Sequence, residues 1–115
     1  MVYTIDEIKE KIQPIAKKYQ LPQVYLFGSY ARGEADEHSD VDVAVETRGS
    51  LATGLDFFAL SDDLEEVLGQ EVDVLSISGM SKDWTYVGQL VYQSYLKERK
   101  LLYEDGTVSE GLFAY

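Results

Sequence analysis

Residues 24–45, VYLFGSYARGEADEHSDVDVAV, carry the pattern that decides the fold. The apolar run 24–27 stops at Gly28 and Ser29, which predicts a buried strand that ends in a tight turn. After an acidic segment, polar and small residues alternate with valine over 40–45, which predicts a second strand. Successive side chains of a strand point to opposite faces, so the valines face a core and the aspartates face away from it.

Helical and strand patterns flank this stretch on both sides. Thr4 and Glu7 form a capping box for an amphipathic helix over 5–19, whose last turn we expect Pro14 to kink or weaken. The other expected elements are helix 54–68 closed by Gly69, strand 71–75, a helix from about 84 to 95, and edge strand 101–103. This order predicts an α/β (α+β) fold with a small mixed β-sheet flanked by helices.

The chain has 115 residues, which is the size of one domain. It has no internal repeat, low-complexity segment or Pro/Gly-rich linker. We therefore predict a single domain over 1–115, with its core at about 5–103. The tail 104–115 is expected to fray, with local packing or contact with a partner as the alternatives.

The net charge of −11 limits the kinds of partner. Binding of nucleic acid through its phosphates, or docking on anionic lipid, needs clustered Lys and Arg, so neither is expected. Cations, nucleotides that arrive with their metal, and basic proteins remain as possible ligands and partners.

The chain has no Cys and one His, His38, which excludes disulfides, thiolate zinc sites and multi-histidine metal sites. His38 lies in the acidic loop and is expected to be exposed. With no signal-peptide pattern and no long apolar run, we expect a cytoplasmic protein without a membrane segment.

Gly28 and Ser29 form the first candidate site. Glycine allows a close approach of the backbone, and N–H groups at a helix start together with the Ser29 hydroxyl suit phosphate oxygens. Taken alone, Gly-Ser after a strand is more often an ordinary turn.

Acidic residues on two strands form the second candidate site. Asp40 and Asp42 leave the same strand face about 6.6 Å apart, which suits one hard cation or a pair of Mg²⁺ ions. The simpler interpretation is a solvated face whose charges protect a sheet edge. Asp73, on the strand 71–75, joins them if the two strands are neighbours. Three carboxylates would repel one another without cations, so their combination favours a metal site.

The spacing Gly28-Ser29, ten residues, then Asp40-Val41-Asp42 matches the GS-x10-DxD signature of the DNA polymerase β-like nucleotidyltransferases. The chain resembles this family over about 5–103, and most closely its minimal nucleotidyltransferases (MNT proteins). That resemblance implies the family's catalytic core fold. It implies that Gly28 and Ser29 hold the triphosphate of ATP.

The resemblance also implies roles for the acidic residues. Asp40 and Asp42 would coordinate two Mg²⁺ ions, and Asp73 would complete the metal site and take a proton from the acceptor hydroxyl. Arg32 and Ser39 match the motif as nucleotide-binding residues. An arginine in an acidic loop has the alternative role of pairing with Glu34 or Asp36.

Many MNT proteins are antitoxins paired with a HEPN-family RNase toxin, and the resemblance implies transfer of AMP from ATP to a tyrosine of such a toxin. Larger relatives add a domain that grips the acceptor, so here we expect the acceptor on another molecule, with a homo-oligomer or a hetero-oligomer with the toxin as possible assemblies. Two alternatives remain. One is an antitoxin that inhibits by binding without catalysis. The other is transfer to a small molecule such as an aminoglycoside.

Overall fold

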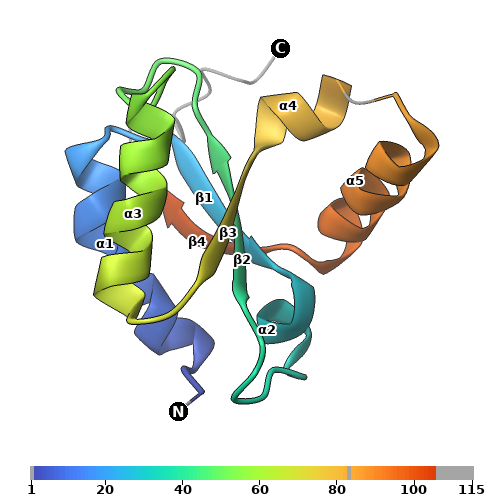
Figure 1. The fold of residues 1–115 in the computed structure, drawn as a ribbon, viewed down its shortest axis with the longest axis horizontal. Coiled ribbons are helices and arrows are strands. Elements are labelled where there is room, and N and C mark those ends of the chain that lie inside the picture. The colour runs from blue at the N-terminus through green and yellow to red at the C-terminus, as the bar shows by residue number, and fades with distance from the viewer. Residues whose placement is uncertain (1, 83, 106–115) are drawn as a thin grey trace.

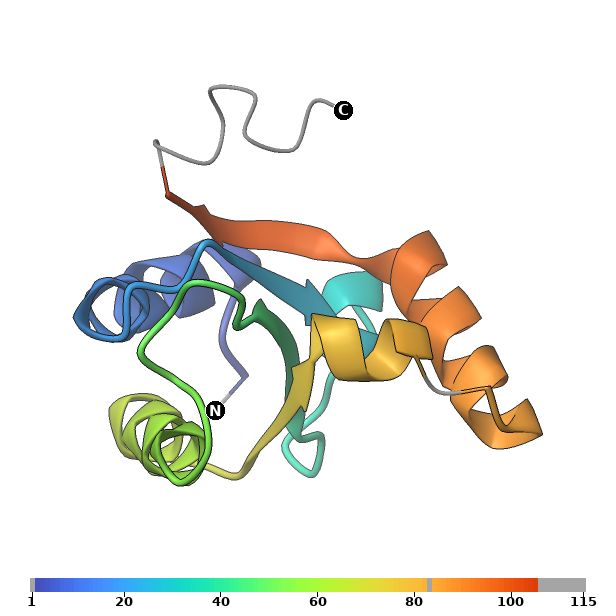
Figure 2. The same ribbon diagram turned by 90° about the horizontal axis from the view of Figure 1, so that it is seen from above.

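The computed structural model describes residues 2–82 and 84–105. In chain order the elements are α1 (Ile5–Lys18), β1 (Gln23–Phe27), α2 (Gly28–Arg32), β2 (Val41–Glu46), α3 (Asp56–Leu68), β3 (Val72–Ser76), α4 (Ile77–Lys82), α5 (Tyr86–Glu98) and β4 (Lys100–Glu104). Helices cover both faces of one sheet, with α1 and α3 on one side and α4 and α5 on the other (Figures 1 and 2). The predicted α/β (α+β) class is confirmed.

The sheet has four strands in the order β3-β2-β1-β4. β1 pairs antiparallel with both β2 and β4, whereas β2 and β3 are parallel. A parallel neighbour requires a crossover, and α3 supplies it between β2 and β3. The sheet is therefore mixed, as predicted, and β4 forms one edge, as predicted for residues 101–103.

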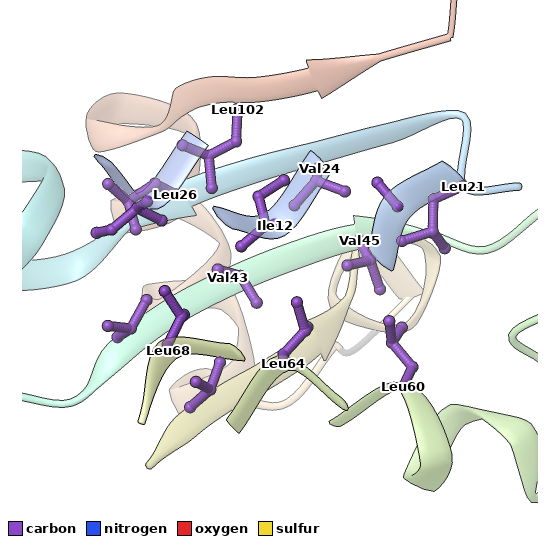
Figure 3. Packing of buried hydrophobic residues seen from close by; sticks show 14 of the residues in the cluster. Ile12, Leu21, Val24, Leu26, Val43, Val45, Leu60, Leu64, Leu68 and Leu102 are labelled. Carbon is purple, nitrogen blue, oxygen red and sulfur yellow. The ribbon is translucent and has the colours of Figure 1, made fainter. Parts of the chain in front are cut away.

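The larger core lies between the sheet and the α1–α3 layer (Figure 3). Alternate residues of the strands point into it, so the valines of β2 face α1 and α3, as predicted. Fully buried members are Ile8, Ile12, Leu21, Val24, Leu26, Val41, Val43, Val45, Leu60, Leu68 and Leu102. Packing on this face fixes which residues of β2 and β3 point to the opposite one.

The opposite face carries a smaller apolar cluster of Phe27, Ala44, Met80 and Tyr95. Tyr95 is fully buried and anchors α5. Its ring meets those of Tyr25 and Phe27 edge to face, at centroid distances of 6.0 and 5.7 Å. Tyr95 is the one residue of α5 that is buried, and most of this helix remains exposed.

Local signals at the helix ends are confirmed. The Thr4 side chain accepts a hydrogen bond from the Glu7 N–H, and the Glu7 carboxylate accepts one from the Thr4 N–H. α1 continues past Pro14 to Lys18, so the proline does not end the helix. Gly69 adopts the left-handed conformation with φ +69° at the end of α3, as predicted.

Three expectations need correction. The segment that became α4 was not predicted as a helix, because ISGMSK is short and rich in Ser and Gly. The helical spacing of apolar residues over 54–68 predicts that Leu55 and Phe58 share the buried side with Leu60, Leu64 and Leu68, but only the three leucines at 60, 64 and 68 are buried. Leu55 precedes α3, which begins at Asp56, and Phe58 is exposed on the helix. Glu104, assigned to the tail, ends β4 and accepts a hydrogen bond from Gln23. The rest of the predicted tail, 106–115, lies outside the described residues.

Within residues 2–82 and 84–105, no helix is long and apolar enough to cross a lipid bilayer.

Candidate active site

Asp42 and Asp73 come together because β2 and β3 are parallel neighbours that begin at the same end of the sheet. The two residues are partners in the parallel β2–β3 register, and Phe27, the last residue of β1, is the partner of Asp42 on its other side. Both carboxylates lie on the face opposite the valine core, as the alternation predicted. The condition that sequence left open, that strand 71–75 neighbours strand 40–45, is met.

The environment of Asp42 disfavours its negative charge. Burial raises the pKa of Asp42 to about 6, and a hydrogen bond to Asp73 and the charges of Asp73 and Asp40 act in the same direction. The guanidinium of Arg32 opposes them by lowering the pKa of Asp42. The site therefore concentrates negative charge beyond what one cationic side chain neutralises.

The turn after β1 touches the same carboxylate. Gly28 has φ +74°, a backbone conformation that is strained for any residue with a side chain. It begins α2 directly after Phe27, which is extended. A Cβ built on Gly28 would overlap the Asp42 Oδ2 atom and lie 3.1 Å from its Cγ. Only glycine fits here, so the backbone of the predicted phosphate turn lies against the predicted metal ligand.

Ser29 lies in the first turn of α2, whereas Ser39 lies in the acidic loop before β2. Ser29 follows Gly28 in the first turn of α2, and its carbonyl accepts a hydrogen bond from Glu34 N–H. The Ser39 hydroxyl accepts a bond from Asp36 N–H and donates to Asp36 Oδ1 at 3.2 Å, so it shapes the acidic loop before β2. His38 is exposed, as predicted, and its backbone N–H donates to Asp36.

Arg32 links α2 to two carboxylates. Its Nε donates to Glu34 at 2.7 Å, the pairing that the sequence offered as an alternative to phosphate contact. Its Nη1 donates to Glu98 of α5 at 2.9 Å. Glu98 lies 66 residues away, and no local pattern could have identified it.

The donor chemistry suits a hard divalent cation, because carboxylate oxygens are the ligands that Mg²⁺ prefers. Asp42 and Asp73 are in contact, while Asp40 is exposed just before β2 and acts on Asp42 through its charge. Among the residues described, no group of three acidic or histidine side chains is close enough to hold a metal ion together. A cation between these carboxylates would offset the repulsion that raises the pKa of Asp42.

A cleft of about 280 Å³ opens beside the Gly28 turn, between α2 and α5. Its lining residues are Phe27, Gly28, Arg32, Leu90, Val91, Ser94 and Glu98. The spacing of Leu90 and Val91 predicts the helix from about 84 to 95, but it did not predict this cleft. One signal was available in the sequence: the apolar residues of α5 are spread over several sides of the helix, whereas packing against one sheet needs only one apolar side.

Several known proteins are similar to this chain in sequence or in fold. A family model described as Polymerase beta, Nucleotidyltransferase matches residues 10–106. MJ0435 of Methanocaldococcus jannaschii, provisionally named a protein adenylyltransferase, is 49% identical over 76 residues, which cover 66% of this chain and 81% of that protein. The protein adenylyltransferase MntA of Thermococcus cleftensis is 33% identical over 81 residues, covering 67% and 81% of the two chains.

A solved structure supports the same relationship. The crystal structure of a toxin–antitoxin with AMP-PNP contains a chain that superposes with a TM-score of 0.67 at 25% identity, covering 89% of this chain and 77% of that one. The sequence match, the fold and the meeting of the Gly28 turn with Asp42 and Asp73 agree. The chain therefore belongs to the polymerase beta nucleotidyltransferase family, as a minimal nucleotidyltransferase similar to MntA.

Proposed function

We propose that this protein is a Mg²⁺-dependent adenylyltransferase that moves AMP from ATP to a hydroxyl group of a partner protein. The observation that carries the proposal is the contact between the Gly28 backbone and the Asp42 carboxylate, with Asp73 at the neighbouring register position. It brings a backbone suited to phosphate against carboxylates suited to a cation. Phosphate and metal must lie in this relation for nucleotidyl transfer.

Each residue has a separate task in the proposed reaction. The backbone at Gly28 and Ser29 holds the triphosphate. Asp42 and Asp73 would hold two Mg²⁺ ions together with Asp40, whose exposed side chain has to turn toward them, and the bound ions would neutralise charge on the phosphates. The acceptor oxygen attacks the α-phosphorus, the bond to the β-phosphate oxygen breaks, and pyrophosphate leaves. Asp73 is exposed and accepts the proton of the acceptor hydroxyl. Arg32 and Ser39 would contact the nucleotide after giving up part of their present hydrogen bonds.

The proposed acceptor is a tyrosine of a HEPN-family toxin, which makes this protein an antitoxin. Two comparisons support it: MntA of Thermococcus cleftensis is named a protein adenylyltransferase, and the structural neighbour is a toxin–antitoxin with an ATP analogue. The net charge of −11 favours association with a basic, RNA-binding partner.

We also propose that residues 1–115 act as one domain.

Docking without catalysis is the competing function. The pair Asp42 and Asp73 argues against this function. Two neighbouring carboxylates repel one another and lower the stability of the fold, and a protein that only inhibits by binding gains nothing from them. Their retention at the Gly28 turn supports a working site.

The test combines the purified protein, Mg²⁺, α-labelled ATP and the product of the adjacent gene, which the proposal takes to be a HEPN protein. The Asp40→Asn/Asp42→Asn double variant is compared with Asp62→Asn, an exposed aspartate on α3. We expect label on the partner with the native protein and Asp62→Asn, and at least about 100-fold less with the double variant. A tight complex without label under any condition would establish docking instead.

A further inference from the structure

The cleft between α2 and α5 has a lining that suits a flat, uncharged ligand. Leu90 and Val91 of α5 are 52% and 38% exposed, and Phe27 forms the wall at the end of β1. Exposed apolar side chains gathered at a hollow often mark a ligand groove. The edge-to-face contact with Tyr95 holds the Phe27 ring in place, so this wall is formed before any ligand arrives.

The polar groups of the cleft disfavour a phosphate inside it. Glu98 lines it with a carboxylate, and the cation nearest to that carboxylate, Arg32, is already bonded to it and to Glu34. An anion inside the cleft would meet a net negative charge, because two carboxylates, Glu34 and Glu98, face one guanidinium. The Ser94 hydroxyl, in contrast, can donate to or accept from a neutral heterocycle.

The cleft begins at Gly28, which is also the residue proposed to hold the triphosphate. A nucleotide bound there has its base and ribose within reach of α5. Small-molecule sites commonly measure about 300–1,000 Å³, so a volume of about 280 Å³ suits part of a nucleotide rather than a whole one. Along α5 the cleft adjoins a hollow of about 560 Å³, which shares Leu90 and Ser94 with it, so the groove continues beyond the part nearest Gly28.

We propose that the purine base of ATP binds in the α2–α5 cleft, against Leu90 and Val91 and beside Ser94. This inference rests on the proposed function, because it takes the triphosphate to lie at Gly28 and Ser29. It gives α5 a role in binding nucleotide. It also accounts for the apolar side chains that this helix leaves exposed beside the active site.

The test measures binding rather than turnover. Calorimetry with Mg²⁺ compares AMP-PNP, which carries the base, with inorganic tripolyphosphate, which carries only the phosphates. Two uncharged variants change the cleft: Ser94→Trp fills it, and Leu90→Gln removes part of its apolar wall. Val87→Trp and Val87→Gln are the matched controls, because Val87 is on the same helix, 68% exposed and not among the cleft residues.

We expect Ser94→Trp to weaken AMP-PNP binding at least about 10-fold and Leu90→Gln by about 3- to 10-fold, with tripolyphosphate binding unchanged in both. The Val87 variants should bind both ligands like the native protein. Thermal melting verifies that each variant is folded.

Three results would overturn the inference. AMP-PNP binding that survives both cleft variants would place the base elsewhere, and loss of partner binding in the same variants would assign the cleft to the acceptor protein. Equal losses in the Val87 controls, or for tripolyphosphate, would show an effect that does not depend on the base. If the native protein binds neither ligand, the proposed function fails as well, so the two failures are distinguishable.

Discussion

Asp42 and Asp73 are register partners in the parallel β2–β3 pair, and burial together with the neighbouring Asp73 carboxyl raises the pKa of Asp42. The crossover through α3 brings them together, although they are 31 positions apart in the sequence. A backbone turn at Gly28 lies against the same Asp42 side chain. Phosphate-binding backbone and cation-binding carboxylates therefore meet at one end of the sheet.

Asp42 makes the stability of the metal-free protein depend on pH. Its pKa is about 6 in the folded protein and near 3.8 in the unfolded chain, so the folded state holds the proton more tightly. The stabilisation from this bound proton is present below pH 3.8 and is lost as pH rises through about 6. We expect Asp42→Asn, which needs no proton, to be more stable than the native protein at about pH 8 by about 1–2 kcal/mol after allowance for solvent screening.

Urea denaturation in EDTA at about pH 8 and about pH 4 measures this difference. At the lower pH the gap between Asp42→Asn and the native protein should shrink toward zero. Asp62→Asn, the exposed control, should show no such change with pH. An Asp42→Asn variant less stable than the native protein at about pH 8 contradicts the prediction.

Gly28 and Gly33 offer a matched pair for testing the turn. Both have φ +74°, but a Cβ at Gly28 meets the Asp42 carboxylate, whereas one at Gly33 meets no atom within 4 Å. Alanine at either position should cost about 1–3 kcal/mol of backbone strain. Gly28→Ala should also displace Asp42 and lower transfer by about 100-fold or more, because small misplacements at a reacting centre have effects of that size.

Transfer assays and melting curves of the two variants give the comparison. Gly33→Ala should keep most of the native transfer rate despite its lower melting temperature. If the two variants lose activity equally, backbone strain alone explains the loss and the contact with Asp42 is irrelevant.

Arg32 and Glu98 should contribute little to stability. Their side chains are 41% and 23% exposed, and exposed ion pairs commonly contribute about 0–1 kcal/mol. A double-mutant cycle with Arg32→Met and Glu98→Gln should therefore give a coupling energy below about 1 kcal/mol. Arg32→Met should raise the KM for ATP if the guanidinium contacts phosphate, while the nearly isosteric Glu98→Gln should leave it within about threefold. An unchanged KM in Arg32→Met limits this residue to pairing with the two glutamates.

Tyr95 should be the most sensitive position on α5. It is fully buried against Tyr25 and Phe27, so Tyr95→Ala should lower the free energy of unfolding by about 3–5 kcal/mol. Tyr86, on the same helix and 79% exposed, provides the control, and its alanine variant should stay within about 0.5 kcal/mol of the native protein. Similar values for the two variants, measured in urea, would mean that Tyr95 does not anchor the helix.

Sequence patterns of a few residues predicted the structure correctly wherever it depends on local geometry. The Thr4–Glu7 capping box, the left-handed Gly69 and the alternation over 40–45 each follow from the reach of one side chain or the period of a strand. The fold class follows from the order of such elements. The GS-x10-DxD spacing identified the family because the strand, turn and strand that carry it are contiguous in the chain.

Packing decided what local patterns left open. Arg32 had an expected partner two residues away, Glu34, and an unexpected one on α5, because tertiary packing brings the end of α5 beside α2. Leu90 and Val91 have the spacing of buried helix residues, yet Tyr95 alone anchors α5 in the core and leaves them beside the Gly28 turn.

The sequence by itself determined most of the elements, the family and the faces on which Asp42 and Asp73 lie, because these depend on contiguous residues and on the fixed period of a strand. Tertiary structure decided that these two carboxylates touch, that Gly28 leaves no room for a Cβ, and that a cleft opens between α2 and α5. Each of those relations joins elements distant in the chain, and only strand pairing and helix packing fix their distances.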